Sequence, residues 1–415
     1  MISRQAFEKI QELSQQFKSV AILGPRQSGK TTLARACFPH KPYISLENPD
    51  SRRFALDDPK GFLQQFPEGA ILDEIQRTPE ILSYLQQILD EDPRRGKFIL
   101  TGSNNFLLVQ SLTQSLAGRV AYLDLLPLSL AELKLLENGL ADLDTCIFQG
   151  GYPALWAENI TASNWFPAYL RTYVERDVRI ISNLENLAAF EKTIALCAGR
   201  VGQLLNRQNI ALEAGVSDKT VEAWLGILQA SYIVFMLPPW FQNFNKRIVK
   251  SPKLYFYDTG LACYLLGIRR PEELRLHPFR GALFENLMVV EMLKARLNRG
   301  ERSNLFHWRD STGNEVDVLV HNGTSQHAVE IKSSQTIATP FFKGLLYWGK
   351  LSQQQGGTVL YGGSENQIRS NGLQVLSWRE SGTVGLPDIT SNPTSWSEKN
   401  EPPGTATIPP GQSAW

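Results

Sequence analysis

A glycine-bounded loop followed by a lysine and a threonine is the first stretch of the sequence that could do chemistry. Gly24 and Gly29 permit backbone dihedral angles that turn successive N–H groups inward, toward a polyphosphate. Lys30 can reach the β- and γ-phosphates, and the Thr31 hydroxyl can bind Mg²⁺. The predicted nucleotide-binding residues of the loop are Gly24, Pro25, Arg26, Gln27, Ser28, Gly29, Lys30, Thr31 and Thr32. A chance match in a surface loop is the alternative, but the apolar run before the loop and the helical stretch after it favour phosphate binding.

Polar residues end two further apolar runs. Asp73 and Glu74 close the first run, and Ser103 and Asn104 follow the second. The carboxyl ends of parallel strands meet at one edge of a sheet, where ligands bind. We therefore expect Asp73 to complete the Mg²⁺ shell and Glu74 to polarise a water for attack on the γ-phosphate. Ser103 and Asn104 would sense that phosphate or orient the water, so the predicted reaction is hydrolysis.

A second group of acids with a lysine lies near the C-terminus. Strand alternation places Asp317, Glu330 and Lys332 on one face of a hairpin that turns at an Asn-Gly pair. Carboxylates that hold Mg²⁺ beside a lysine that positions or activates water have the chemistry of phosphodiester cleavage. A solvated face with a cross-strand ion pair is the alternative. The same face could also bind nucleic acid without cutting it.

The elements that must position these residues begin with strands and helical stretches that alternate to about residue 135. This alternation is typical of a parallel sheet with helices on both faces, so the expected fold class is α/β. Helical stretches with aromatic anchors follow, and then short helices and a hairpin with the spacing of a winged helix. A tail rich in Pro, Ser, Thr and Gly is expected to be disordered. The expected domain ranges are 1–135, 136–198, 199–258, 259–385 and 386–415.

Basic residues gather in the expected winged-helix hairpin and could meet the phosphates of DNA. They are Lys246, Arg247, Lys250 and Lys253. The preceding helix, which would enter the major groove, carries Asp218 and Glu222, and acidic residues are unfavourable there. DNA binding and a packing or self-association role therefore both remain open.

Composition limits the partners and the compartment. Forty-two basic residues against 41 acidic residues give a formal net charge of +1, so no global field draws the chain to nucleic acid or to an anionic membrane. The four cysteines are far apart without a C-x-x-C pair, which favours a reducing compartment and disfavours zinc. No apolar run approaches the length of about 20 residues that a spanning helix needs. We expect a cytoplasmic protein with no membrane partner.

The loop, the acid pair and the polar strand end together resemble an AAA-type ATPase. More specifically, the chain resembles a family of prokaryotic AAA ATPases that carry a C-terminal domain of unknown function. The stretches that carry this resemblance are residues 117–119, 150–153, 169–178 and 251–260. It implies an ATP-binding cytoplasmic protein with the parallel sheet of P-loop NTPases. Arg119 is our first candidate for an arginine that meets the γ-phosphate of the same subunit or of a neighbour, ahead of Arg171 and Arg176, with a surface or structural ion pair as the alternative.

The order of the C-terminal acids around their hairpin resembles the restriction-endonuclease-like nuclease superfamily. This resemblance implies a second α/β domain, assigns metal binding to Asp317 and Glu330, and makes Glu285 the helix-borne acid of the pattern. The resulting prediction is an ATPase that uses Mg²⁺ and is coupled to a nuclease-like domain acting on DNA. A nucleotide-dependent switch or scaffold, and a DNA-binding regulator without nuclease activity, remain as alternatives.

Overall fold

The computed structural model describes residues 2–103, 116–136, 140, 142–158, 160–174, 186–241 and 249–386. The chain up to Val384 forms one compact unit, and a second unit begins at Gly385. The predicted residues Asn104, Arg176, Lys246 and Arg247 lie outside the described residues, as does the expected disordered tail after residue 386.

Within the described residues, the N-terminal part contains a five-stranded sheet in which every neighbouring pair is parallel. Its strands lie in the order β2-β3-β4-β1-β5. They are β1 (Ser19–Gly24), β2 (Tyr43–Ser45), β3 (Ile71–Asp73), β4 (Phe98–Ser103) and β5 (Val120–Asp124). The predicted α/β parallel sheet is confirmed. Because β1 lies between β4 and β5, the loop that follows it opens within the carboxyl edge of the sheet.

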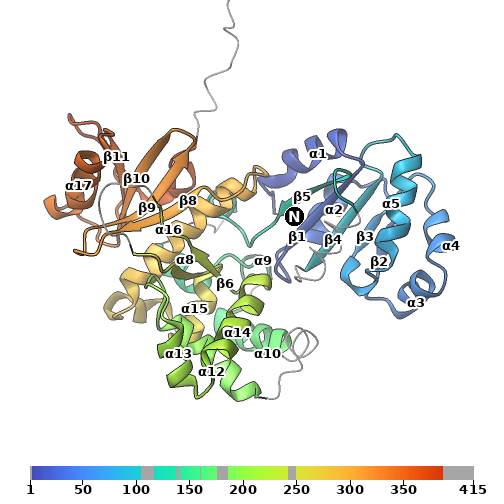
Figure 1. Cartoon of the computed structure of the whole chain (residues 1–415), viewed down its shortest axis with the longest axis horizontal. Helices are drawn as coiled ribbons and strands as arrows, with labels where there is room; N and C mark the ends of the chain where they lie inside the picture. Colours follow the sequence, from blue (N-terminus) through green and yellow to red (C-terminus); the bar gives the residue numbers. More distant parts are fainter. Residues whose placement is uncertain are drawn as a thin grey trace, which may run out of the picture. The chain divides into compact units, whose positions relative to one another are not determined.

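Helices cover both faces of this sheet (Figure 1). Val20 and Ile22 of β1 belong to a buried cluster that includes residues of α1 and α2. Ala21 and Leu23 point to the other face, where residues of α3, α4 and α5 complete a second cluster. The alternation of apolar side chains along β1 therefore places the strand between two helical layers. The helices are α1 (Ala6–Gln16), α2 (Lys30–Cys37), α3 (Pro49–Asp57), α4 (Pro59–Gln64), η1 (Ile75–Arg77) and α5 (Ile81–Glu91).

A largely helical middle part follows the sheet. Its helices include a pair joined by a tight turn, in which Gly215 ends α13 with a left-handed φ of 74° and the Ser217 hydroxyl caps α14. A two-stranded antiparallel sheet, β6 and β7, follows this pair. The elements are α7 (Leu130–Leu133), α8 (Leu143–Gln149), α9 (Pro153–Ala157), α10 (Ala162–Thr172), α12 (Leu187–Ala198), α13 (Arg207–Ala214), α14 (Asp218–Ala230), β6 (Val234–Leu237), β7 (Lys253–Phe256), α15 (Thr259–Leu265) and η3 (Pro271–Leu276).

The C-terminal part contains a mixed sheet in the order β12-β13-β11-β10-β9-β8. Val318 and Val329 share a buried cluster with residues of α16, whereas Leu319 and Ala328 share another with residues of α17 (Figure 1). Both faces of the β9–β10 hairpin are therefore covered. The elements are α16 (Arg280–Leu297), β8 (Leu305–Arg309), β9 (Glu315–Asn322), β10 (Ser325–Lys332), η4 (Thr339–Phe342), α17 (Lys343–Ser352), β11 (Gly357–Tyr361), β12 (Gln367–Ile368), β13 (Leu373–Ser377) and η5 (Trp378–Thr383).

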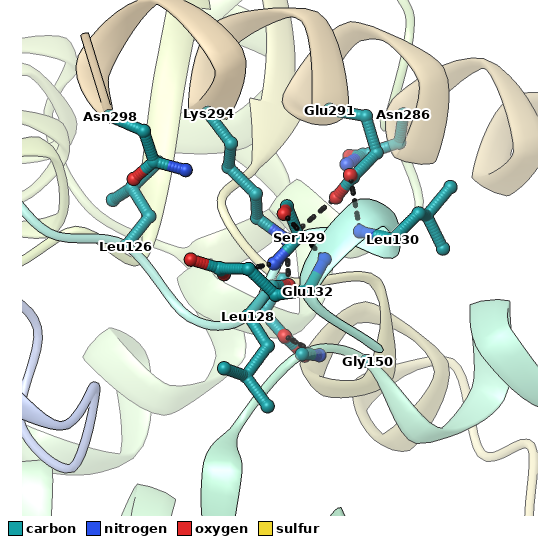
Figure 2. A network of polar contacts seen from close by, with 12 residues as sticks. Leu126, Leu128, Ser129, Leu130, Glu132, Gly150, Asn286, Glu291, Lys294 and Asn298 are labelled. Carbon is teal, nitrogen blue, oxygen red and sulfur yellow. Dashed lines mark hydrogen bonds and ion pairs between the residues drawn. The ribbon is translucent and has the colours of Figure 1, made fainter. Parts of the chain in front are cut away.

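Buried polar contacts attach the segment after β5 to α16 (Figure 2). The Lys294 ammonium donates to the carbonyl oxygen of Leu128 over 2.7 Å and to Glu291 Oε1 over 2.8 Å. The N–H of Leu130 donates to Glu291 Oε2 over 2.6 Å. Because a buried charge is costly without partners, this pair of charges fixes the segment to α16.

Candidate functional site: a phosphate loop and a buried acid–lysine pocket

Two glycines give the loop between β1 and α2 its shape. Gly24 has a φ of 151°, and a Cβ at this position would overlap the carbonyl oxygen of Leu125. Gly29 has a φ of 91° and immediately precedes α2. Both backbone conformations are unfavourable for residues with a side chain. The loop therefore brings the chain to the N-terminus of α2, where partial positive charge favours an anion.

Lys30 and Thr31 lie at the first turn of α2. The Lys30 ammonium donates to the carbonyl oxygens of Gly24 over 3.1 Å and Pro25 over 2.6 Å, so it lies against the loop. The Thr31 hydroxyl donates to Asp73 Oδ1 over 2.9 Å. A hydroxyl and a carboxylate oxygen are the ligand types that Mg²⁺ prefers, and Mg²⁺ commonly takes its remaining ligands from phosphate and water. Thr31 and Asp73 therefore fit the Mg²⁺ position of a nucleotide site.

Other side chains fix the Asp73 carboxylate at the end of β3. The Tyr43 hydroxyl donates to Oδ2 over 2.8 Å, and the Thr101 hydroxyl donates to Oδ1. Burial raises the pKa of Tyr43 to about 12, and its hydrogen bond to Asp73 contributes to the shift. Tyr43 therefore remains a donor at neutral pH, and Asp73 is held in one orientation.

Glu74 follows Asp73 at the end of β3 and lies beside the phosphate loop, at the wall of a cavity. Its φ of 59° is uncommon for a residue with a side chain and indicates a backbone held in place by its surroundings. The Gln76 amide donates to the Glu74 carboxylate and, over 2.8 Å, to the Ser103 hydroxyl. Glu74 lines a cavity of about 490 Å³ together with Lys30 and Thr31. The predicted residues of β1, β3 and β4 are thus brought together, with Gln76 linking two of them.

Arg119 does not join this group. It directly precedes β5, and Val120 pairs with Ser19, the first residue of β1, so Arg119 lies at the amino edge of the parallel sheet. Its guanidinium donates to Asp90 Oδ2 over 2.9 Å. The prediction that Arg119 meets the γ-phosphate of its own chain is therefore wrong, because the phosphate loop lies at the carboxyl edge.

Arg4 holds the phosphate loop through a hydrogen bond to its backbone. Its guanidinium donates to the Ser28 carbonyl oxygen over 2.6 Å, to the Leu126 carbonyl oxygen over 2.7 Å and to Glu132 Oε1 over 3.0 Å. Glu132 is fully buried and also accepts the N–H groups of Gln5 and Ser129. One buried ion pair therefore connects the loop with the segment that contacts α16.

A second cavity, of about 600 Å³, contains the C-terminal acids. The Lys332 ammonium lies 3.0 Å from Asp317 Oδ2 and 2.6 Å from Glu330 Oε2. The N–H of Ile331 also donates to Asp317 Oδ2 over 2.8 Å. The hairpin thus brings together the three side chains that strand alternation had placed on one face. Asp317 is 9% exposed and Glu330 6%, so the solvated face of the alternative prediction is wrong, whereas its cross-strand ion pair is present between Lys332 and Asp317.

Glu285 reaches this cavity from α16, but its partners come from β7. The Lys253 ammonium lies 3.0 Å from Glu285 Oε1 and 2.5 Å from Glu315 Oε1. The Tyr255 hydroxyl donates to the same Glu285 oxygen over 2.5 Å. Lys253 is 3% exposed and so is not available to meet DNA phosphates, contrary to the prediction, whereas Lys250 is exposed.

Burial and neighbouring charges shift the pKa values of the carboxyl groups in this pocket. Burial raises the pKa of Glu330 to about 8, and the charge of Asp317 adds to the shift. Burial also opposes ionisation of Asp317, but the attraction of Lys332 and Lys253 outweighs it and lowers the pKa. Burial raises the pKa of Glu285 as well. Burial and the neighbouring charges therefore shift the pKa values of Asp317 and Glu330 in opposite directions.

The pocket does not have the arrangement of a metal centre. Throughout the part of the chain that the structure describes, no three His, Cys, Asp or Glu side chains are grouped so that they could hold a metal ion. The acids of this pocket are instead separated by the two lysines described above. The Mg²⁺ role predicted for Glu285, Asp317 and Glu330 therefore does not fit the observed positions.

Three families of protein domains match successive parts of the chain. The AAA domain matches residues 16–134, a domain of unknown function (DUF8612) residues 140–272, and another domain of unknown function (DUF4143) residues 280–380. The uncharacterized proteins Rv2008c of Mycobacterium tuberculosis and Mb2031c of Mycobacterium bovis are each 32% identical over 322 residues, which cover 76% of this chain and 70% of theirs. The chain belongs to their family.

This chain combines the AAA domain with a C-terminal part that matches two domains of unknown function. In this chain the AAA match and the parallel sheet together give an AAA-type P-loop domain, as predicted. The Walker-type ATPase of Pyrococcus abyssi is a solved structure similar to this chain, at 17% identity and a TM-score of 0.42, covering 64% of this chain and 96% of that one. None of the described helices has the length and apolar character needed to cross a membrane.

Sequence reasoning missed several supporting residues. Tyr43 on β2 and Gln76 in η1 donate hydrogen bonds to the predicted acids, but these two residues belong to no motif. Arg4 and Glu132 lie 128 positions apart, so nothing local linked them. Lys253 had been assigned to DNA phosphates, and its pairing with Glu285 and Glu315 was not predicted. The polar character of each was visible, but its partner was not.

Proposed function

We propose that this protein binds ATP with Mg²⁺ and hydrolyses it at the carboxyl edge of its parallel sheet. One observation carries the proposal: the Thr31 hydroxyl lies 2.9 Å from Asp73 Oδ1, and Thr31 lines the same cavity as Lys30 and Glu74. A Mg²⁺ ion bound there would neutralise phosphate charge during transfer.

The chain's own residues supply the remaining roles. The N–H groups of the loop and the N-terminus of α2 would bind phosphate oxygens, and the Lys30 ammonium would exchange its carbonyl partners for the β- and γ-phosphates. Glu74 would orient a water and accept its proton. The Gln76 amide donates to both Glu74 and Ser103. A movement of Ser103 when it contacts the γ-phosphate would therefore also shift the Glu74 carboxylate.

Binding of a fluorescent ATP analogue tests the first step. Lys30→Ala should weaken binding by at least about tenfold, because a charged contact to phosphate is lost. Lys60→Ala, which removes an exposed lysine from α4, is the matched control and should bind as the wild type does. Equal binding by the wild type and Lys30→Ala would reject this site.

We propose, as a second function, that the C-terminal pocket cleaves or binds DNA. The convergence of Asp317, Glu330 and Lys332 supports it, since a lysine beside acids can position and activate water. Cleavage of labelled single- and double-stranded DNA, with and without ATP, is the assay. Loss of cleavage in Asp317→Asn would support a nuclease. Intact DNA in every sample would favour a nucleotide-dependent switch or a DNA-binding regulator.

The domain boundaries that accompany these proposals are those expected from the sequence, at about residues 135, 198, 258 and 385. We also propose a cytoplasmic location, because all four cysteines are buried free thiols. Self-association of the AAA domain is proposed as the route by which an arginine of a neighbouring copy, Arg119 included, would reach the nucleotide.

A further inference from the structure

Lys253 is an unusual residue to find buried at the wall of the C-terminal cavity. It lies on β7, within the segment matched by one domain of unknown function, whereas Glu285 and Glu315 belong to the segment matched by the next. The side chain of Lys253 is 4% exposed. Removing an ammonium group from water is costly, so its carboxylate partners must hold it there.

Two lysines divide the acids of the pocket between them. Lys332 takes Asp317 and Glu330, both from the β9–β10 hairpin. Lys253 takes Glu285 from α16 and Glu315 from β9, and so connects three elements. Each ammonium lies between carboxylate oxygens, in the kind of position that a divalent cation would occupy.

The distances to the carboxylate oxygens show whether this position suits Mg²⁺ or the Lys253 ammonium. Carboxylate oxygens approach Mg²⁺ to about 2.0–2.1 Å, so ligand oxygens must lie close to one another. Around Lys253 the carboxylate oxygens stand 2.5 Å and 3.0 Å from the nitrogen, a spacing set by hydrogen bonds. A metal ion cannot share this space with the ammonium, because the two positive charges would repel each other at short range.

We propose that Lys253 is an internal cation that keeps divalent metal ions out of the C-terminal pocket by occupying the position between Glu285 and Glu315. The inference concerns the pocket for which DNA cleavage was proposed, and it names how that function would be held off. It explains why acids in the order of a nuclease are present without the grouping of a metal centre.

A titration with Mn²⁺ in the absence of nucleotide tests the inference on the full chain, with bound and free ion separated by electron paramagnetic resonance. Asp73→Asn serves as the parent, because it removes the metal ligand of the nucleotide site. Lys253→Met should then bind one Mn²⁺ with a dissociation constant lowered by at least about tenfold, since a repelling charge has been removed. Adding Asp317→Asn or Glu285→Gln should abolish the gain. Lys350→Met, at an exposed lysine of α17, is the matched control and should behave as the parent.

Lys253→Met leaves Glu285 without its cation and Glu315 with Arg309 alone, 3.4 Å away, so its stability is measured together with binding. Lys253→Gln keeps a hydrogen-bond donor without the charge and serves as the second variant if the methionine variant does not fold. Tighter Mn²⁺ binding by either variant supports the inference. Binding no tighter than in the parent, or a parent that already binds Mn²⁺ in a manner lost on Asp317→Asn, overturns it. A variant that gains the metal yet leaves DNA intact would reject the nuclease function while the role of Lys253 stands.

Discussion

Replacing Arg4 tests whether the buried ion pair behind the phosphate loop holds that loop in place. Arg4→Met removes the donors to the Ser28 and Leu126 carbonyl oxygens and leaves the Glu132 carboxylate without its cation. The two side chains are 6% and 0% exposed, so water does not screen the pair. Breaking a buried pair on one side costs about 3–5 kcal/mol. We expect a value near the lower limit, because Glu132 keeps two backbone N–H donors.

Urea unfolding followed by tryptophan fluorescence measures this change in the free energy of unfolding. The double variant Arg4→Met with Glu132→Gln should recover about 1–3 kcal/mol relative to Arg4→Met, because the unpaired buried charge is gone. Arg4→Met should also weaken ATP binding, because the Ser28 carbonyl of the phosphate loop loses its donor, and this loss should persist in the double variant. If Arg4 had only a structural role, the free energy of unfolding and the ATP affinity should recover together in the double variant.

Arg119→Met is the control, because it removes the same kind of side chain from an exposed pair. The side chains of Arg119 and Asp90 are 29% and 47% exposed, and such a pair contributes less than about 1 kcal/mol. A loss at Arg4 no larger than the loss at Arg119, or strictly additive effects of Arg4→Met and Glu132→Gln, would refute the reasoning.

Three further predictions concern the backbone, pH and the thiols. Gly24→Ala should reduce ATP binding by at least about tenfold and lower the melting temperature, because its Cβ would overlap the Leu125 carbonyl; an unchanged melting curve would contradict this. Burial, with the nearby charge of Lys253, lowers the pKa of His307 to about 4, so the folded state resists a proton that the unfolded state accepts near its ordinary pKa of about 6.5. Stability should therefore fall as pH drops from about 6.5 toward 4, by about 2 kcal/mol at pH 5, and His307→Gln should lack this part of the urea-midpoint shift. Burial raises the pKa of the thiols, so a thiol reagent at pH 8 should label the native chain far more slowly than the urea-unfolded chain; the thiols are Cys37, Cys146, Cys197 and Cys263.

The sequence was sufficient to bring the candidate nucleotide-site residues together, because they lie in one loop and at the ends of strands. The loop is contiguous, and Asp73 and Ser103 close strands of one parallel sheet, so the carboxyl-edge rule brought them together. The same rule misplaced Arg119, because the residue was assigned to the carboxyl end of β4. It directly precedes β5 and so lies at the amino end of that strand. Whether a residue enters or leaves a strand decides the edge on which it lies.

The C-terminal pocket was predictable in part. Asp317, Glu330 and Lys332 lie on two strands of one hairpin, and the period of two aligned them. Lys253 pairs with Glu285 and Glu315 through packing of β7 against α16 and the C-terminal sheet, and no local pattern records such a contact. A lysine that looked exposed in the sequence was therefore assigned to DNA. Long-range partners of charged residues were the part of the site that sequence alone could not supply.

Steady-state ATP hydrolysis by the wild type and Glu74→Gln, measured beside nucleotide affinity, tests the central claim most directly. Glu80→Gln, at an exposed acid nearby, is the control. The account predicts that Glu74→Gln binds ATP as the wild type does but turns it over about 100-fold more slowly, because the group that accepts the proton from water is lost. Equal turnover by Glu74→Gln and the wild type, or a wild type that binds ATP without hydrolysing it, would contradict the account.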